Sequence, residues 1–272
     1  MEYVSLRGAK VPALGLGTWL LEGEDCRSAV PAALEMGYRH IDTAQIYGNE
    51  AEIGTALRNS DVQRQEIFLT TKIWNDCHAA GEVVRSTEES LRKLQTDYVD
   101  LLLIHWPVEF DRVGETLEAM VGLQERGLTR MIGVSNFTRA QFSAASELAP
   151  VACNQVEYHP FLNQRALRDA ARATDAVITA YSPLARGGVF SDDTLLRIGK
   201  QHGKSPAHVA LRWLLDQDLL VVPKATGKEH LASNLEVFDF VLTAEERTAI
   251  GGLARGERLV DPPFAKWEDD GA

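Results

Sequence analysis

Cysteine is scarce in this chain. Its three cysteines, Cys26, Cys77 and Cys153, are scattered over 272 residues without a CxxC or CxxH spacing. This pattern argues against a disulfide framework and a zinc site, and it favours a reducing compartment. Cys77 lies close to Trp74 in a predicted loop, and we expect an inert thiol there. We therefore expect a cytoplasmic protein without a bound metal.

Long apolar runs, a leader sequence and a basic excess are also missing. No apolar run approaches the ~20 residues that cross a membrane, and Met1-Glu2-Tyr3 does not open a signal peptide. The 28 basic residues are outnumbered by 39 acidic ones, which leaves a net charge of -11. This charge opposes binding to nucleic acid or anionic lipid. We expect a soluble monomer with small-molecule partners.

Short apolar runs recur along the chain with a regular rhythm. Eight predicted strands occupy residues 14–18, 38–42, 67–72, 99–105, 131–135, 153–157, 177–182 and 219–224. Segments of helical period lie between them, such as 81–94, 112–126 and 138–148, where Thr138 and Gln141 match a capping box. Apolar strands that alternate with amphipathic helices indicate a parallel sheet covered by helices. Eight units in about 250 residues predict a (β/α)8 TIM barrel.

The two ends of the chain depart from this alternation. Residues 3–6 and 11–14 flank a turn at 7–10 and are predicted to form a hairpin. Residues 243–246, Thr-Ala-Glu-Glu, begin an extra capped helix after the last strand. An irregular tail is predicted from Ala254 to Ala272.

Proline and glycine shape two further expectations. Pro31 falls inside the first helical pattern, where it costs ~3 kcal/mol outside the first turn, so we expect a short or kinked helix. No stretch of Gly, Ser or Pro is long enough to divide the chain. A single domain over residues 1–272 is the simplest interpretation.

Reactive side chains stand at the carboxyl ends of three neighbouring predicted strands, where such barrels carry their active sites. Asp42 ends the second strand, and Tyr47 follows in its loop before a helix-capping Asn49. Lys72 ends the third strand and His105 the fourth. Taken singly, each has an ordinary alternative as a surface charge, a turn cap or a packed polar residue. Their occurrence on adjacent strands predicts one shared site.

These four groups suit the protonation of an oxygen in a dry pocket. A free phenol is a poor acid at neutral pH, but the ammonium of Lys72 would lower the pKa of Tyr47. An ion pair with Asp42 would keep a buried Lys72 charged. Tyr47 could then act as a general acid while His105 holds the substrate oxygen. The group is suited to reducing a carbonyl.

Eight motifs in a fixed order cover nearly the whole chain. They are Leu14-Gly-Leu-Gly-Thr-Trp19, Tyr38-Arg-His-Ile-Asp-Thr-Ala44 with Tyr47-Gly-Asn-Glu50, Thr71-Lys-Ile-Trp-Asn75, Leu103-Ile-His-Trp-Pro107, Gly133-Val-Ser-Asn-Phe137, Asn154-Gln-Val-Glu-Tyr-His-Pro160, Ala180-Tyr-Ser-Pro-Leu184 and Val222-Pro-Lys224. With these motifs the chain resembles the aldo-keto reductases, and in particular bacterial members of the diketogluconate reductase type.

The resemblance implies a function and a set of site residues. Asp42, Tyr47, Lys72 and His105 look like the family's catalytic tetrad, which uses hydride from a nicotinamide cofactor to reduce aldehydes or ketones. The residues implied to contact that cofactor are Thr18, Trp19, Ser135, Asn136, Gln155, Tyr181, Ser182, Leu184, Lys224, Ala225, His230 and Asn234.

The roles within that cofactor set follow from the resemblance as well. Ser135, Asn136 and Gln155 would hydrogen-bond the carboxamide, and Tyr181 would stack on the nicotinamide. Ser182 and Leu184 would lie along the pyrophosphate, and Lys224 would meet the adenosine 2'-phosphate.

The phosphate region departs from the family pattern. Many members have Ser after the Pro-Lys pair, Arg six residues beyond the Lys, and Glu-Asn further on. This chain has Ala225, His230, Ser233 and Asn234 in these places. A charge-assisted hydrogen bond is worth ~1.5–3 kcal/mol, so losing a fixed cation would reduce NADPH preference by ~10 to 100-fold. We expect NADPH as cofactor with NADH also accepted, and a phosphate contact from His230 that strengthens at lower pH.

The predicted substrate pocket is apolar. Trp19, Trp74 and Trp106 flank catalytic or rim positions and are predicted to line it, with ordinary packing as the alternative. The loops after His105 and after Tyr181 are short, which predicts an open site with broad tolerance. Small aldehydes, dicarbonyls such as methylglyoxal, and keto sugars all remain admissible.

Three other functions remain open. A metal-dependent hydrolase is suggested by His40, Asp42, His105 and His159, but it leaves Tyr47 and Lys72 without a role. A Schiff-base aldolase would use Lys72 or Lys224 as its nucleophile. A cofactor-binding, redox-sensing regulatory protein with little turnover would share the fold and the tetrad.

Overall fold

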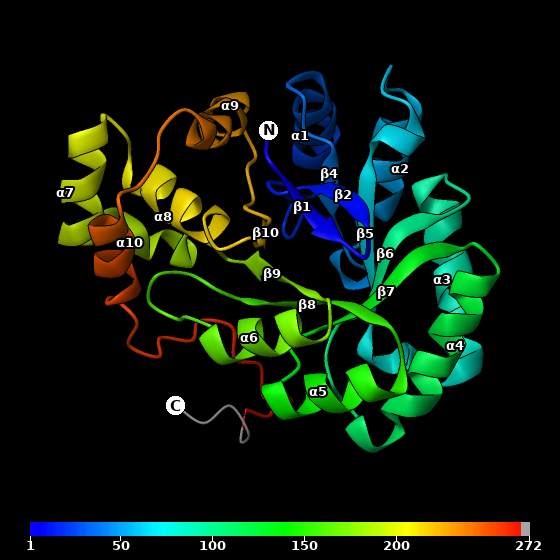
Figure 1. Cartoon of the computed structure of the whole chain (residues 1–272). Helices are drawn as coiled ribbons and strands as arrows, with labels where there is room; N and C mark the ends of the chain where they lie inside the picture. The colour runs from blue at the N-terminus through cyan, green and yellow to red at the C-terminus, as the bar shows by residue number, and fades with distance from the viewer. Residues whose placement is uncertain (268–272) are drawn as a thin grey trace.

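The computed structural model of the chain describes residues 1–267, and its centre is a sheet of eight parallel strands (Figure 1). The strands are β3 (Leu16–Gly17), β4 (His40–Asp42), β5 (Phe68–Ile73), β6 (Val99–Ile104), β7 (Thr129–Ser135), β8 (Val151–Glu157), β9 (Val177–Tyr181) and β10 (Leu220–Val221). Each strand pairs with the next along the chain. Parallel bridges from Leu14 to Val221 and from Gly17 to Lys224 join the first and last strands. The predicted (β/α)8 barrel is confirmed.

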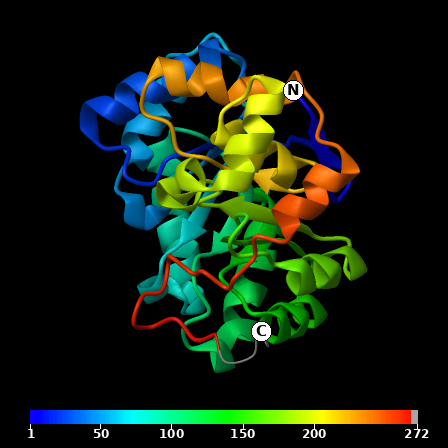
Figure 2. The ribbon, with the colours of Figure 1, turned by 90° about the vertical axis from the view of Figure 1, so that its left-hand side faces the viewer.

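Helices alternate with these strands and cover the outside of the barrel (Figures 1 and 2). They are α1 (Gly23–Glu35), α2 (Glu50–Arg58), α3 (Ala80–Leu94), α4 (Val113–Glu125), α5 (Arg139–Leu148), α6 (Arg165–Ala173), α7 (Asp193–His202), α8 (Pro206–Leu215), α9 (Lys228–Leu235) and α10 (Ala244–Gly251). The predicted capping boxes are present at Thr138 of α5 and Thr243 of α10. The extra C-terminal helix is therefore confirmed.

Alternate residues of each strand face two different cores. In β6, Leu102 and Ile104 belong to the large core between sheet and helices, whereas Leu101 and Leu103 point into the barrel. The inner core also contains Leu6 of the N-terminal hairpin. The barrel is thus filled with side chains below its mouth, and only its upper end is open to ligands.

The N-terminal hairpin is confirmed with a shifted second strand. β1 (Tyr3–Leu6) pairs with β2 (Ala9–Pro12) rather than with residues 11–14. The turn is shorter than predicted because Arg7 and Gly8 both adopt positive φ, 47° and 83°, as a two-residue hairpin turn requires.

Two local predictions near the first helices need correction. The predicted shortening of α1 at Pro31 is wrong, since the helix continues to Glu35; the predicted kink stays a prediction. The apolar face of α1 is buried in the large core, and that burial offsets the lost hydrogen bond. Asn49 precedes α2 but its side chain does not cap that helix. Its amide instead donates to the carbonyls of Thr18 and Leu21, which ties two loops of the barrel mouth together.

The C-terminal tail is irregular, as predicted, through residues 254–267. The backbone N–H groups of Arg255 and Glu257 donate to the carbonyl of Phe161. Figure 2 shows the tail in red, passing from α10 across the cyan and green part of the barrel. Residues 268–272 of the predicted tail lie outside the described residues.

Candidate active site

A cavity of about 980 Å³ opens at the carboxyl ends of the strands. Its wall includes residues at or near the carboxyl ends of all eight strands and from the C-terminal tail. The predicted site residues that line it are Thr18, Trp19, Asp42, Tyr47, Trp74, His105, Trp106, Ser135, Asn136, Gln155, Tyr181, Ser182, Leu184 and Lys224. Polar groups at the centre and aromatic rings near the mouth make it suitable for a small organic ligand.

The Lys72 ammonium is fully buried beneath this cavity and all three of its N–H donors are used. It donates to Asp42 Oδ1 at 2.7 Å, to the Thr43 carbonyl at 2.8 Å and to Tyr47 Oη at 3.4 Å. The phenol oxygen of Tyr47 accepts the hydrogen bond from Lys72, so the phenol proton remains available to a ligand in the cavity. The structure therefore brings together three of the four predicted catalytic residues.

The Asp42 carboxylate is held on both oxygens. Its second oxygen, Oδ2, accepts from Gln155 Nε2 at 2.6 Å, and the hydroxyl of Thr18 binds the Asp42 carbonyl at 2.9 Å. Asp42 ends β4 and Gln155 lies on β8, across the barrel. The carboxylate that balances Lys72 is consequently fixed from two sides.

Burial changes the proton affinity of each group. It opposes the charged form of Lys72, but Asp42 and Tyr47 outweigh this effect and raise the lysine pKa, so the ammonium stays protonated. Burial also raises the pKa of Tyr47, and the lowering effect of Lys72 does not overcome it. The expectation of a lowered phenol pKa is corrected: Tyr47 is a fully protonated donor at neutral pH.

The His105 ring completes the centre as a neutral imidazole. Its pKa lies well below the ordinary value because of burial and, secondly, because of the Lys72 charge. Its ring meets Tyr47 edge-on, with centroids 5.7 Å apart. Among the described residues no group hydrogen-bonds its buried Nδ1, which favours the tautomer that carries the proton on Nε2.

Three polar residues beside this centre hold one another in place. Asn136 Nδ2 donates to the His105 carbonyl at 2.9 Å and to Ser135 Oγ at 3.1 Å. Asn136 Oδ1 accepts from the Tyr181 hydroxyl at 2.7 Å. Asn136 has a φ of 62°, a conformation that asparagine tolerates better than most residues. The three residues are therefore preorganised at the cavity wall.

The outer end of the cavity contains only some of the residues that were predicted to contact the cofactor there. Ser182, Leu184 and Lys224 line it, and Arg186, which the sequence did not single out, lies there too. Ala225, His230 and Asn234 do not line the cavity. His230 is exposed on α9, and Asn234 is buried beside the Tyr38 hydroxyl. Their contacts with a cofactor remain predictions.

Aromatic rings surround the mouth. Trp19 packs on Tyr47 with centroids 4.9 Å apart, and Trp74 meets His105 edge-on at 5.2 Å. Trp106 and Trp74 both contact Phe264 of the tail, at 5.3 and 6.2 Å. The predicted tryptophans thus line an apolar slot beside the polar centre.

Two of the histidines behind the metal alternative are engaged elsewhere. The His40 ring hydrogen-bonds the Pro12 carbonyl at 3.1 Å, and His159 pairs with Glu157 at 2.9 Å. Within residues 1–267 no three His, Cys, Asp or Glu side chains are grouped as for a metal ion. Lys72, as a charged ammonium, is a poor Schiff-base nucleophile.

Comparisons with known proteins agree with this class of site, a carbonyl-reducing centre on a (β/α)8 barrel. The sequence model of the Aldo/keto reductase family matches residues 13–255. The chain belongs to the aldo-keto reductase family and is an oxidoreductase. Family members generally use NAD(P)H. Within the described part of the chain, no helix has the length and apolar character to cross a bilayer.

Similar proteins cover almost the full chain. Methylglyoxal reductase DkgB from Salmonella typhi is 43% identical over 93% of this chain and 96% of its own length. An aldo-keto reductase from Mycolicibacterium smegmatis is 42% identical over 94% of both chains. A solved structure provisionally described as 2,5-diketo-D-gluconic acid reductase B has 44% identity and a TM-score of 0.96, covering 98% of both chains.

Proposed function

We propose that this protein reduces aldehydes, ketones, dicarbonyls or keto sugars to alcohols with NAD(P)H, and that Tyr47 is the general acid. The proposal rests on one observation above others, the contact of the buried Lys72 Nζ with Tyr47 Oη at 3.4 Å at the floor of the cavity. A phenol in this position can deliver its proton to a ligand oxygen.

Tyr47 gives up its proton when negative charge develops on the substrate oxygen. The alkoxide that forms is a much stronger base than a phenolate, so a phenol with a raised pKa still transfers its proton downhill. The phenolate left behind is stabilised by the ammonium of Lys72, whose charge is balanced by Asp42. The proton is then replaced from solvent through the open mouth.

His105 orients the substrate. A neutral imidazole with its proton on Nε2 donates one hydrogen bond to the carbonyl oxygen and polarises it. A charged imidazole at this position would be repelled by the Lys72 ammonium. The lowered pKa of His105 keeps the ring neutral and so suits this role.

The residues present fit a nicotinamide nucleotide. Ser135, Asn136 and Gln155 offer uncharged polar groups for a carboxamide, the Tyr181 ring offers a flat face, and Lys224 lies at the outer end for a phosphate. When bound, the reduced nicotinamide supplies the hydride to the carbonyl carbon. Gln155 also holds Asp42, so it would link the carboxamide to the acid that balances Lys72.

NADPH is the proposed preferred cofactor, with NADH also accepted. Lys224 lies at the cavity rim, but His230 is exposed on α9 outside the cavity lining, so it can reach a phosphate only across the rim. Steady-state kinetics with both cofactors at two pH values test this. A preference for NADPH that is unchanged by pH and survives His230→Ala would remove His230 from the proposal.

The apolar slot favours small carbonyl compounds. Methylglyoxal and 2,5-diketo-D-gluconate, named for similar proteins, are the first compounds to test. We also propose a cytoplasmic monomer of one domain. The net charge of -11 supports the absence of nucleic-acid and membrane partners.

The decisive experiment is a turnover screen of these carbonyls with NADPH and NADH, comparing wild type with Tyr47→Phe. The variant removes the proton donor and keeps the ring. We expect reduction to fall by roughly 10²–10⁴-fold, while quenching of tryptophan fluorescence by the cofactor is retained. Equal rates would refute Tyr47 as the acid. Tight cofactor binding without turnover of any carbonyl would instead favour a redox-sensing regulatory protein.

A further inference from the structure

The C-terminal segment Leu259–Phe264, called the strap here, forms one side of the cavity. Leu259, Val260, Asp261, Pro262 and Phe264 all line it, although no residue of the strap belongs to a helix or strand. A segment without regular structure needs another source of order to keep a fixed place at a binding site. Its contacts show where that order comes from.

A buried carboxylate holds the beginning of the strap. Glu157 Oε1 accepts from the Leu259 N–H at 2.9 Å, and Oε2 accepts from the Val260 N–H at 2.9 Å. Oε1 also binds His159 Nε2 at 2.9 Å. The Glu157 side chain is fully buried at the end of β8. Charge-assisted bonds to backbone N–H groups in such surroundings are strong and directional.

The electrostatics of Glu157 agree with an ionised clamp. Burial opposes ionisation, but the bonds from His159, Val260 and Leu259 outweigh it and lower the glutamate pKa. Without the strap, two of these donors would be missing and the charge would be left in a buried site. The carboxylate and the strap therefore stabilise each other.

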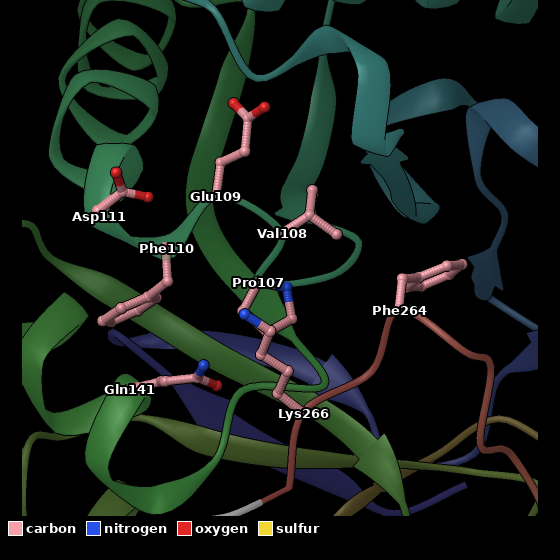
Figure 3. A pocket seen from close by; sticks show the side chains of 8 residues that line it. All are labelled: Pro107, Val108, Glu109, Phe110, Asp111, Gln141, Phe264 and Lys266. Atoms are coloured by element: carbon pink, nitrogen blue, oxygen red, sulfur yellow. The ribbon is translucent and has the colours of Figure 1, made fainter.

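The other end of the strap is held by aromatic contacts and by a hydrogen bond within the tail, from Trp267 Nε1 to Asp261 Oδ1 at 2.9 Å. Phe264 remains 42% exposed, and its described ring contacts are edge-on meetings with Trp106 and Trp74. Phe264 also borders a second cavity of about 430 Å³, lined on its far side by Glu109 and Asp111 (Figure 3). Figure 3 shows Phe264 and Lys266 projecting from the same segment of tail. Phe264 thus stands between the active-site slot and additional space.

We propose that Glu157 is a positioning residue for substrate specificity: it clamps the strap so that Phe264 closes the apolar slot against Trp74 and Trp106. This inference rests on the proposed carbonyl reduction. With the clamp intact, the slot fits small carbonyls such as a three-carbon dicarbonyl. With the strap released, the slot loses this wall and larger aromatic carbonyls gain access.

Glu157→Gln tests the clamp, with Glu50→Gln as a matched control. The amide keeps one acceptor oxygen and presents an NH₂ group, so it cannot accept from both strap N–H groups and His159. Glu50 is an equally buried carboxylate that accepts from Thr71 and does not touch the strap. The pair separates release of the strap from the general loss of a buried carboxylate.

Hydrogen exchange gives a readout that is independent of activity. Mass spectrometry of peptides spanning residues 259–264 follows the two clamped amides, and peptides from β6 report on the fold. We expect exchange of the strap to accelerate at least about tenfold in Glu157→Gln, the equivalent of one charge-assisted bond. In Glu50→Gln it stays at the wild-type rate. Unchanged exchange in Glu157→Gln would overturn the clamp.

Kinetics test the consequence for specificity. The ratio of kcat/KM for 2-naphthaldehyde to that for methylglyoxal should rise about tenfold in Glu157→Gln, through KM and with kcat of methylglyoxal nearly unchanged. If hydrogen exchange shows a released strap in Glu157→Gln but the ratio of the two kcat/KM values is unchanged, Glu157 has no role in specificity. If wild type reduces no carbonyl, the proposed function fails, whereas the exchange experiment still decides whether Glu157 clamps the strap.

A second variant covers the case in which Glu157→Gln does not fold. Val260→Pro removes one clamped N–H from the strap and leaves every buried side chain in place. It should produce the same acceleration of exchange at Leu259 and the same shift of the kinetic ratio, in the same direction. Wild-type behaviour of this variant in both measurements would contradict the proposal.

Discussion

The floor and the rim of the active-site cavity are built in different ways. At the floor, Asp42, Lys72 and Gln155 stand on strands, are almost completely buried and are joined by hydrogen bonds of 2.6 and 2.7 Å. At the rim, large apolar side chains stand on loops and on the tail and are about half exposed: Trp19, Leu20, Ile46, Phe190 and Phe264. One region is buried and polar, the other exposed and apolar.

This difference separates two tasks. A proton is transferred reliably only where the donor and its charge partner are held within a few tenths of an ångström, which strands of a barrel provide. Recognition of varied carbonyl compounds needs apolar surface that can change without disturbing that geometry. We expect substitutions at the floor to abolish chemistry and substitutions at the rim to alter KM.

The largest effect should follow from removing the buried cation. Lys72→Met leaves the Asp42 carboxylate buried and unpaired, so the free energy of unfolding should fall by about 3–5 kcal/mol. Urea denaturation measures it. The double variant Asp42→Asn, Lys72→Met should recover most of the loss because both charges are gone. If Lys72→Met lowers the free energy of unfolding by less than about 1 kcal/mol, as expected for a surface ion pair, the floor does not differ from the rim in this respect.

A slightly smaller effect is expected for His105, the group proposed to hold the carbonyl oxygen. His105→Phe keeps an aromatic ring and removes its N–H, so kcat/KM should fall by roughly 10²–10³. Unfolding by urea checks that the variant remains folded, and cofactor quenching of tryptophan fluorescence checks the site. Activity within a few-fold of wild type would mean that Tyr47 orients the carbonyl without help.

Acid should destabilise the protein through its buried imidazoles. Burial lowers the pKa of His40, His78 and His105 below the ordinary value, so the unfolded chain binds protons that the folded chain excludes. Stability is therefore full above pH ~6.5 and is lost as the pH falls, by up to about 1.4 kcal/mol per pH unit for each ring. Glu50, whose pKa is raised by burial, works in the opposite direction and reduces the net slope.

Urea denaturation at pH 7.5, 6.5 and 5.5 measures that slope. His40→Asn should make this slope shallower, because it removes one ring from which the folded chain excludes a proton. His40 does not line the cavity. A slope that is the same in His40→Asn and wild type would show that the acid sensitivity has another origin.

The smallest effect belongs to the rim. Phe264→Ala removes the ring that closes the slot against Trp74 and Trp106. KM for methylglyoxal should therefore rise by about three- to tenfold, KM for a larger aromatic aldehyde should not rise, and kcat should stay within twofold. Steady-state kinetics with methylglyoxal and an aromatic aldehyde measure it. A fall in kcat comparable to that of His105→Phe would show that rim and floor do not act separately.

Much of the fold could be predicted because its signals are local. Each strand from β4 to β9 shows as an apolar run, and each capping box is four residues long, so neighbours in sequence are sufficient to recognise them. The predicted shortening of α1 at Pro31 was wrong because the helix is stabilised by burial against the sheet, which depends on residues far away in the sequence. The predicted helix cap at Asn49 was wrong because the hydrogen-bond partners of its side chain, Thr18 and Leu21, lie in another loop.

The sequence by itself determined the alternation of strands and helices, and with it the convergence of Asp42, Tyr47, Lys72 and His105, since strand ends of a parallel barrel share one rim. Only the tertiary structure decided the net proton affinity of Tyr47 and the place of the strap. Proton affinity depends on burial by the whole chain. The strap is held by a carboxylate 102 residues away, a separation at which periodicity carries no information.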